Sequence, residues 1–572
     1  MASTAAGTPE TPDTAGIQGG APAPEEGWDR TVDVVVLGTG AAGLSAATLA
    51  ADGGAQVLVL EKAAMIGGTT GVSGGMPWVP CNHHLADVDE TDSRDEALAY
   101  IRRLTMGRES DPALVETYVD TAAEMVAYLE AHTPVRFAAP PTFSDYYADQ
   151  VGGKRRGRSL EVEPFDARTE LGDWAPKLRT SPFMPRLTMA EGAKFGTPDA
   201  PDLSILAERE AKDIRVLGPG LVAMLFKGLL DRGVPVLDRS PARELVTGPD
   251  GSVLGVVAET AAGPLRVRAR GGVVLACGGF EWNPDMVRAF VGRDVVPLSP
   301  PYNEGDGHRM AMALGARMAN MNQVWGQPAV TDPGVVYEGR QLYQYETLRN
   351  LAGTLMVNRH GRRFTNEGVT YNDMTKAFAA FDPVAIDYPN QGPAWLVFDQ
   401  KLRDRTPILS VMPGQETPDW LANSPTLRGL AELVGIDADA LEETVARFNE
   451  HADAGADPDF ARGTVWWENF MGSGGNPRVN LGPVRKGPFY ALPIHDGVLG
   501  TNGGPLVDAD ARVRRWDGGV VEGLYAAGNA AANVFGPMYP GGGATIGPAL
   551  TFGYLAGRHA AARAGRGARR DA

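Results

Sequence analysis

The segment VDVVVLGTGAAGLSAATLAADGGAQVLVLE, residues Val32–Glu61, predicts a strand, a glycine-rich turn, an alanine-rich helix and a second strand. Gly38, Gly40 and Gly43 have the spacing G-x-G-x-x-G, which lets bare backbone approach a pyrophosphate and lets the helix pack closely on the strand. The helix N-terminus then favours phosphate charge. Glu61 ends the second strand about 20 residues further on, where an acid can accept the hydroxyls of an adenosine ribose. The segment therefore predicts a dinucleotide-binding βαβ unit.

Length and composition narrow the class of protein. The 572 residues are enough for two domains and a tail. A formal net charge of −17 gives no basic surface for nucleic acid, and no apolar run is long enough to span a bilayer. Cys81 and Cys277 are too few for a disulfide framework and form no recognisable metal-ligand cluster with the eight histidines. We therefore expect a cytoplasmic protein with no metal site and no nucleic-acid partner.

Three further segments carry glycine-rich turns. Gly67–Gly75 places five glycines in nine positions directly after the predicted ribose-binding strand, which suits a backbone that lies against a flat ring system. Buried strands then lead into a GGF turn after Val273–Cys277 and into an AAGN turn after Val520–Tyr525. These turns predict a second part of the same nucleotide site.

Helical periodicity extends from Ser93 to about Glu130 and returns at Ala549–Ala562. The first residues, Met1–Trp28, are rich in Ala, Pro, Thr, Gly and acids and lack the features of a signal peptide, so they predict a disordered tail. The last residues, Arg563–Ala572, predict a short basic, solvated tail.

Several motifs together resemble a known family. They are GTGAAG, GGTTGVSGG, SDYY followed by GGK and GRS, LACGGF, NRHGRRFTNE with a following tyrosine, KGPFYA, GLYAAGN, and YPGGGATIGPAL with FGYLA. Between Val32 and His559 the chain resembles the flavoproteins of the fumarate reductase and succinate dehydrogenase type. Within that group it is most similar to the FAD-dependent 3-ketosteroid dehydrogenases, in particular the Δ1-dehydrogenases, with SDYY and YPGGG as the more discriminating segments.

The resemblance implies an α/β fold in which a Rossmann-like FAD-binding domain is built from both chain ends around an inserted α+β cap. The expected boundaries are 1–30 for the disordered tail, 31–281 and 487–562 for the two parts of the FAD-binding domain, 282–486 for the catalytic cap, and 563–572 for the basic tail.

The cofactor implied by the resemblance is FAD. Covalent members of the wider family carry a histidine where this chain has Gly68, and neither His83 nor His84 matches that position, so non-covalent binding is expected. The residues expected to bind FAD are Gly38, Gly40, Ala42, Gly43, Glu61, Lys62, Gly68, Thr69, Thr70, Ser73, Gly74, Gly75, Gly278, Gly279, Gly528, Asn529, Thr545 and Ile546.

The resemblance also assigns Tyr371 as the catalytic base, Tyr147 as its supporting phenol, and Tyr539 with the backbone N–H of Gly543 as donors to the substrate's C3 carbonyl. Elementary chemistry agrees, because an α C–H becomes acidic only when the ketone oxygen is stabilised as it gains charge. A phenol with a pKa of about 10 is a weak base and needs a neighbour that hydrogen-bonds its anion. The expected reaction is 1,2-desaturation of a neutral 3-ketosteroid, with hydride transfer to flavin N5 and an electron acceptor that the sequence does not identify.

The chain departs from the family at a few positions. Thr370, Gly542 and Ala148 stand where the steroid enzymes have prolines, and Pro185–Asp213, in the expected pocket wall, differs from the family. The glycine predicts a looser backbone near the carbonyl site, and the changed wall predicts an altered substrate pocket.

Four alternative interpretations stay open at this point. They are a fumarate reductase-like ene-reductase, a desaturase of a non-steroid cyclic ketone, a flavoprotein that holds FAD without turnover, and an NAD-linked dehydrogenase. The first needs arginines for a dicarboxylate, yet the matching loops contain Tyr371 and Tyr539. The last is disfavoured because only one dinucleotide fingerprint is present.

Overall fold

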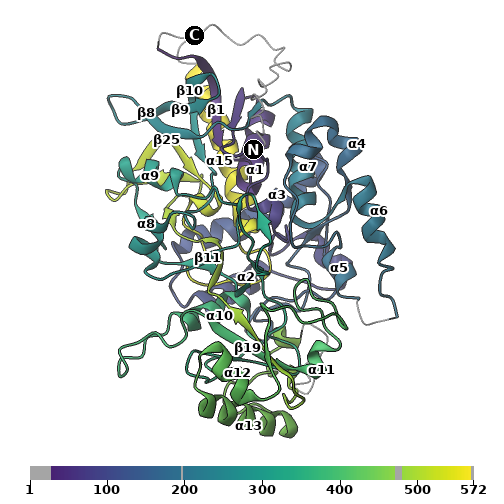
Figure 1. The fold of residues 1–572 in the computed structure, drawn as a ribbon. Coiled ribbons are helices and arrows are strands. Elements are labelled where there is room, and N and C mark those ends of the chain that lie inside the picture. Colours follow the sequence, from purple (N-terminus) through teal and green to yellow (C-terminus); the bar gives the residue numbers. More distant parts are fainter. Residues whose placement is uncertain (1–26, 195–197, 470–479, 569–572) are drawn as a thin grey trace, which may run out of the picture.

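The larger part of the molecule is organised around one central sheet (Figure 1). The computed structural model describes residues 27–194, 198–469 and 480–568, so nearly all of the predicted N-terminal tail lies outside the described residues. The strand order is β24-β25-β10-β1-β2-β7, with β9 paired to β10 and β8 paired to β9. Their bounds are β1 Arg30–Leu37, β2 Val57–Leu60, β7 Val236–Leu237, β8 Ala242–Thr247, β9 Val253–Thr260, β10 Gly263–Leu275, β24 Arg512–Arg514 and β25 Val520–Ala526.

Strands from both ends of the chain meet in this sheet. β1 pairs in parallel with β2 and β10, and β10 pairs in parallel with β25, which comes from the C-terminal part. The VVVL run of β1 is buried on both faces, as expected for a parallel sheet covered by helices. The prediction that both ends of the chain contribute strands to the nucleotide-binding sheet is therefore confirmed.

Two helices on the sheet pack unusually closely. α1 (Ala41–Asp52) lies against α15 (Ile546–Ala568), and a Cβ atom at Gly557 would lie 2.1 Å from the carbonyl oxygen of Ala46. Glycine is therefore required at that contact. The predicted helix at Ala549–Ala562 is too short, because α15 continues through Arg563, whose Nη1 donates to the carbonyl of Arg270 at 3.1 Å. The part of the predicted basic tail that the structure describes is thus the last turns of an alanine-rich helix.

The helical region predicted from Ser93 to about Glu130 is two helices. α2 (Arg94–Thr105) ends at Met106, which is left-handed with φ 52°. α3 (Pro112–His132) begins after Asp111, whose side chain accepts a hydrogen bond from the N–H of Ala113 at 2.9 Å. The proline at the first helical position and the acidic cap explain the restart, which periodicity alone did not reveal.

The cap contains a second sheet, with strand order β18-β19-β21-β20. Its strands are β18 Thr354–Val357, β19 Ala394–Asp399, β20 Ala422–Ser424 and β21 Phe489–Ile494, and helices α10 (Tyr371–Phe378), α12 (Leu427–Val434) and α13 (Ala438–Ala454) cover it. Alternate residues supply two separate cores: Leu355 and Val357 face α12 and α13, whereas Met356 faces α10. In Figure 1 α12 and α13 lie at the far end of the molecule from β1 and β10, and α10 lies nearer the middle.

Strand pairing extends the cap beyond its predicted end. β21 lies after the expected boundary at residue 486, yet it pairs along its whole length with β19 of the cap sheet. The predicted boundary is therefore too early, because the KGPFYA motif reads as a strand without indicating which sheet the strand joins.

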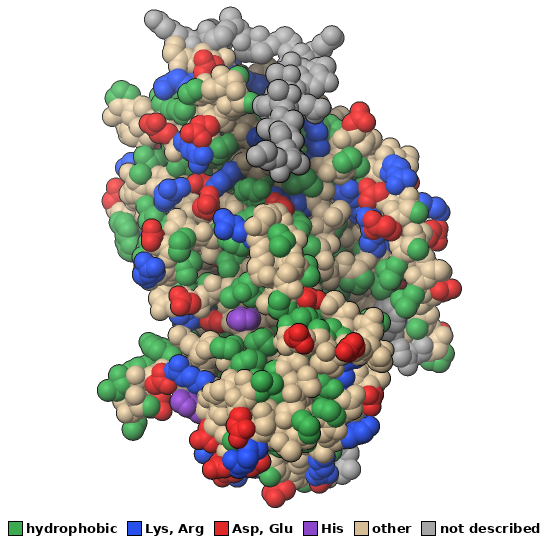
Figure 2. Space-filling view, in the orientation of Figure 1, with side chains coloured by type: hydrophobic (Ala, Val, Ile, Leu, Met, Phe, Trp, Pro, Cys, Tyr) green, Lys and Arg blue, Asp and Glu red, His purple; other side chains and the backbone are tan. Residues whose placement is uncertain are grey.

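Charged side chains of both signs are present on the molecular surface (Figure 2). Acidic and basic side chains are interspersed over the face drawn in Figure 2. Within the described ranges, no helix combines the length and hydropathy that crossing a membrane requires.

Candidate active site

A cavity of about 430 Å³ lies where the glycine-rich turns meet the cap. Most of the predicted cofactor residues line it, namely Gly38, Gly40, Ala42, Glu61, Lys62, Gly68, Thr69, Thr70, Ser73, Gly74, Gly75, Gly278, Gly528, Asn529, Thr545 and Ile546. Two predicted residues, Gly43 and Gly279, do not line the cavity. A Cβ atom at Gly43 would lie 2.0 Å from the carbonyl oxygen of Gly38, and one at Gly279 would lie 2.3 Å from Oγ1 of Thr501, so these glycines serve internal packing.

At other glycines the space of a side chain is open, although Gly68 also has a left-handed φ of +50° that favours glycine. A Cβ atom at Gly40, Gly68 or Gly74 would meet no atom closer than 3.6, 3.7 and 3.9 Å, respectively. These positions face the cavity, so the space that a side chain would take is available to a ligand. Backbone without side chains, beside the N-terminus of α1, fits the pyrophosphate and ring system of a dinucleotide.

Glu61 is fixed at the end of β2. Its side chain is buried and accepts hydrogen bonds from the N–H of Thr39 at 3.1 Å and of Ala63 at 2.8 Å. Lys62 forms an ion pair with Asp306, with Nζ 2.7 Å from Oδ2. An acid held by backbone amides at the cavity wall is suited to accept ribose hydroxyls, as the sequence predicts.

A polar network behind the second glycine loop was not anticipated. Nδ2 of Asn303 donates to Oγ1 of Thr69 at 2.9 Å and to Oε1 of Glu281 at 2.7 Å. On another wall, Nε1 of Trp325 donates to Oδ1 of Asn529 at 3.1 Å. These contacts orient polar groups that line the cavity, and they join segments so distant in sequence that spacing gives no signal for them.

Three phenols gather at the cap side of the cavity. The ring centroids of Tyr146, Tyr371 and Tyr539 lie 5.4 to 5.7 Å from one another, and all three residues line the cavity. The phenol of Tyr371 interacts by hydrogen bonds with the hydroxyls of Tyr146 and Tyr539. The three rings form a compact cluster in which each phenol is a neighbour of the other two.

Tyr147, the predicted supporting phenol, does not line this cavity. It is half-buried, and its backbone N–H donates to the hydroxyl of Tyr100 at 3.2 Å. Tyr146 lines the cavity in its place, at the start of a turn that follows Asp145. Of the two tyrosines in SDYY, the one that lines the cavity is therefore Tyr146 and not the predicted Tyr147.

Tyr371 is positioned by helix α10, which packs against two hydrophobic cores. It is the first residue of α10, and Met374 and Phe378 of the same helix are buried in the cap core, one turn and two turns further on. The ring of Tyr371 packs against the core of the nucleotide-binding part. The helix therefore places Tyr371, a residue of the cap, in the wall of the cavity.

The loop Tyr539–Gly543 is held by hydrogen bonds rather than loose. The carbonyl of Pro540 accepts from the hydroxyl of Tyr100 at 2.6 Å and from the N–H of Tyr146 at 3.0 Å. The carbonyl of Gly542 accepts from Oγ of Ser159 at 2.8 Å. The looser backbone expected from Gly542 is therefore not found, and the phenyl ring of Phe143 fills the space where a side chain at Gly542 would lie.

Gly543 adopts a conformation that requires glycine. Its φ is +102°, and a Cβ atom would lie 2.2 Å from the carbonyl oxygen of Met76. The N–H of Gly543 interacts with the hydroxyl of Tyr539. The two donors predicted for the carbonyl oxygen therefore lie side by side in the structure.

A buried ion-pair network anchors the SDYY segment. Nη1 of Arg158 lies 2.8 Å from Oδ2 of Asp145, and Arg158 also binds Asp92 through two nitrogens at 2.8 and 2.6 Å. Asp145 accepts in addition from Nε1 of Trp78 at 2.7 Å. These contacts give a physical reason for the acid in SDYY and the arginine in GRS: the two motifs form one buried pair beside Tyr146.

The surroundings keep the phenols neutral. Burial raises the pKa of Tyr371 well above its usual value, and hydrogen bonds with Tyr146 and Tyr539 raise it further. Burial also raises the pKa of Tyr146 and of Tyr539. A phenolate at Tyr371 therefore requires its two neighbours to turn their hydroxyls and donate hydrogen bonds to it.

Comparison with known proteins agrees with this geometry. Residues 33–546 match the family described as FAD binding domain. The chain belongs to this family of FAD-binding flavoenzymes. Its cofactor is FAD, and the residues that face the cavity fit that group. The fold class and the resemblance to 3-ketosteroid dehydrogenases that the sequence predicts are confirmed.

Three relatives illustrate the range of the family. The chain is 39% identical to 4-oxocyclohexanecarboxylate 2-dehydrogenase of Sinomonas cyclohexanicum, with 93% of each protein covered. It is 37% identical to 3-oxosteroid 1-dehydrogenase of Mycolicibacterium smegmatis, covering 93% of this chain and 97% of that one. The structure of 3-ketosteroid Δ1-dehydrogenase from Sterolibacterium denitrificans matches with a TM-score of 0.85 at 34% identity, covering 93% and 99% of the chains. This flavoenzyme is an oxidoreductase with dehydrogenases of ring ketones among its relatives.

Proposed function

We propose that this flavoenzyme introduces a C=C bond beside a ring ketone, by 1,2-desaturation of a 3-ketosteroid. The observation that carries the proposal is the grouping of Tyr371, Tyr146, Tyr539 and Gly543 at one end of the FAD cavity. A base flanked by a supporting phenol, beside two neutral donors, matches what removal of an α-proton from a ketone requires.

The steps follow from the positions of the side chains. Tyr539 and the N–H of Gly543 donate to the ketone oxygen, which stabilises the charge that develops there as the α C–H bond breaks. Tyr371 in its phenolate form, having first lost its hydroxyl proton to solvent, takes the α-proton and becomes the neutral phenol. Before that step Tyr146 stabilises the phenolate by donating a hydrogen bond to it. Bound FAD supplies the acceptor for the hydride that leaves the neighbouring carbon.

Charge in the cavity supports a neutral substrate. Arg349 lines the cavity, but its Nε lies 3.5 Å from Oε2 of the buried Glu346, and its Nη1 donates to the carbonyl of Val369 at 2.9 Å. Arg179 also lines the cavity and forms an ion pair with Glu338. Each arginine is already matched by a glutamate, so a dicarboxylate would meet compensated charge rather than a free cation.

The names of the relatives indicate ring-ketone substrates, and these substrates differ in size and charge. One acts on an oxosteroid and another on 4-oxocyclohexanecarboxylate, as their names state. Met189, from the Pro185–Asp213 segment that departs from the family, lines the cavity. Its thioether and the nearby Phe183 form an apolar wall that suits a hydrocarbon ring system. We therefore favour the steroid, with the smaller carboxylated ketone as the second candidate.

Anaerobic flavin reduction tests the proposal. The holoenzyme is mixed separately with a saturated 3-ketosteroid, 4-oxocyclohexanecarboxylate and succinate, and the loss of oxidised-flavin absorbance is followed. We expect rapid bleaching with the steroid and none with succinate. Faster bleaching by the cyclohexanone would select the second candidate, and turnover with succinate or of fumarate would contradict both.

A further inference from the structure

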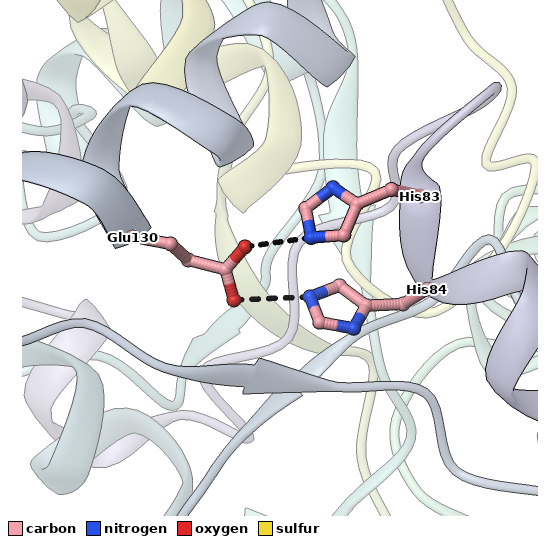
Figure 3. A group of neighbouring side chains, drawn as sticks. All are labelled: His83, His84 and Glu130. Atoms are coloured by element: carbon pink, nitrogen blue, oxygen red, sulfur yellow. Dashed lines mark hydrogen bonds and ion pairs between the residues drawn. The ribbon is translucent and has the colours of Figure 1, made fainter.

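Two adjacent histidines and one glutamate point toward one another (Figure 3). None of the three is among the residues that line the cavity. His83 and His84 begin the short helix η2 (His83–Val88), and Glu130 lies near the end of α3. Nε2 of His83 is 3.0 Å from one oxygen of Glu130, and Nε2 of His84 is 3.0 Å from the other. The sequence prediction of no metal site did not consider this group, because 45 positions separate the glutamate from the pair.

The three side chains are held by further contacts. Nδ1 of His84 lies 2.9 Å from Oδ2 of Asp87, so a carboxylate orients the ring from behind. Oε1 of Glu130 accepts from the N–H of Phe137 at 2.9 Å. Histidine ligands of metal ions characteristically use their second ring nitrogen in this way, which fixes the tautomer and the ring orientation.

The group is open to solvent on one side only. The side chain of His83 is 53% exposed, whereas those of His84 and Glu130 are 13% and 15% exposed. An ion could therefore enter from solvent past His83 and reach donors that are already largely desolvated. All of the donor atoms lie within 4.8 Å of one another, so small movements would bring them to one centre.

The donor set selects a class of ion. Two imidazole nitrogens and one carboxylate oxygen suit Zn²⁺ and neighbouring divalent transition metals, whereas Mg²⁺ and Ca²⁺ prefer all-oxygen sites. A second group, His451 with Asp457 and Asp459, is less suitable. Its acids already pair with arginines, since Arg363 lies 2.8 Å from Asp457 and Arg447 binds Asp459.

We propose that His83, His84 and Glu130 form a Zn²⁺ site, with water completing a tetrahedral shell. Each Nε2 would bind the ion through its lone pair, while Nδ1–H of His84 donates to Asp87. This proposal is independent of the substrate assigned above.

The position of the site gives the ion a structural effect. The ion would join η2 to α3. Shortly before η2 in the chain lies Trp78, and the N–H of Trp78 donates to the carbonyl of Gly543 at 3.1 Å. Nδ2 of Asn82, next to His83, donates to the carbonyls of Val79 and Gly157 at 2.7 and 2.8 Å. Bound zinc would therefore stabilise the segment from Trp78 to His84, which supports Gly543. We expect zinc to raise the thermal unfolding temperature.

Titration of untagged, chelator-treated holoenzyme tests the site by calorimetry and by metal analysis after dialysis. We expect one Zn²⁺ per chain and no binding of Mg²⁺. His84→Ala and Glu130→Gln should lose this binding, and Asp87→Asn should weaken it about 10- to 100-fold through loss of the orienting carboxylate. His360→Ala is the matched control, because His360 is another exposed histidine beside an acid, 3.4 Å from Asp387.

Flavin content and unfolding temperature establish that each variant is folded. Unchanged zinc binding in folded His84→Ala or Glu130→Gln, or loss of binding in His360→Ala, would overturn the assignment. The wild-type measurement needs no variant: absence of stoichiometric Zn²⁺, or no difference between Zn²⁺ and Mg²⁺, would also overturn it.

Discussion

The ring of Tyr146 lies 5.4 Å from that of Tyr371, centroid to centroid, whereas Tyr147, the next residue, is not among those that line the cavity. We therefore propose the supporting role for Tyr146, the first tyrosine of the SDYY motif. This relationship also makes the two tyrosines a matched pair, because they share a segment and differ in the direction of their side chains.

Tyr146→Phe should therefore slow flavin reduction by the ketone substrate, while Tyr147→Phe should leave it nearly unchanged. Removal of the Tyr146 hydroxyl takes away the donor that stabilises the Tyr371 phenolate, and about 10-fold or more is expected from a lost hydrogen bond to a charged group. Anaerobic stopped-flow measurement of both variants checks the expectation. Equal rates in the two variants would remove Tyr146 from the mechanism.

Gly543→Ala should damage both the loop and the carbonyl site. The new Cβ atom would lie 2.2 Å from the carbonyl oxygen of Met76, at a φ of +102° that alanine rarely adopts. Displacement of the N–H should reduce the rate of flavin reduction by about 10²- to 10³-fold, the cost typical of one lost oxyanion donor. Gly565→Ala, where the new Cβ atom would meet no neighbour, is the control. Near-normal rates in Gly543→Ala would show that this N–H does not bind the ketone oxygen.

Arg158→Met should destabilise the fold by about 3 to 5 kcal/mol, since it leaves the buried carboxylates of Asp92 and Asp145 without their cation. Arg94→Met is the control, because Arg94 pairs with Asp120 at the surface, where solvent screens the pair and its loss should change stability little. Denaturant unfolding of the holoenzyme measures both. Similar losses in the two variants would show that the buried network does not anchor this segment.

Acid precipitation should release all of the flavin. Among the described residues that line the cavity, none is a histidine, and the one cysteine, Cys277, has its pKa raised to about 12 by burial, so it stays an unreactive thiol. Absorbance of the washed pellet and of the supernatant measures the distribution. Yellow colour retained by the pellet would indicate a covalent link and a wrong expectation.

The fold class and the FAD cofactor could be predicted from the sequence, whereas the direction of individual side chains could not. The βαβ unit, the glycine loops and Tyr539 with Gly543 were located from motifs, because each depends on local backbone requirements that spacing records. The exchange of Tyr147 for Tyr146 depends on which way one side chain points, and a motif with two adjacent tyrosines does not encode that. Similarly, the placement of β21 in the cap sheet depends on a pairing partner almost 100 residues away.

At two positions where the chain departs from the family, contacts with other residues compensate for the missing proline. Gly542 does not loosen its loop, because the ring of Phe143 occupies the vacated space and Ser159 holds the carbonyl. Thr370, before the proposed base, is buried, and its hydroxyl interacts with Oδ2 of Asp373 at 3.0 Å, so a polar contact replaces a rigid ring. Such compensation involves residues from other segments, which a single sequence does not connect.

The rate of flavin reduction in Tyr371→Phe is the most direct test of the proposed proton removal. With a saturated 3-ketosteroid under anaerobic conditions, the rate should fall by about 10²- to 10⁴-fold, the usual cost of losing a positioned base, while FAD stays bound. Tyr147→Phe, measured in parallel, should keep the wild-type rate. A rate in Tyr371→Phe within a few-fold of wild type would contradict the account, because the α-proton would then leave through another group.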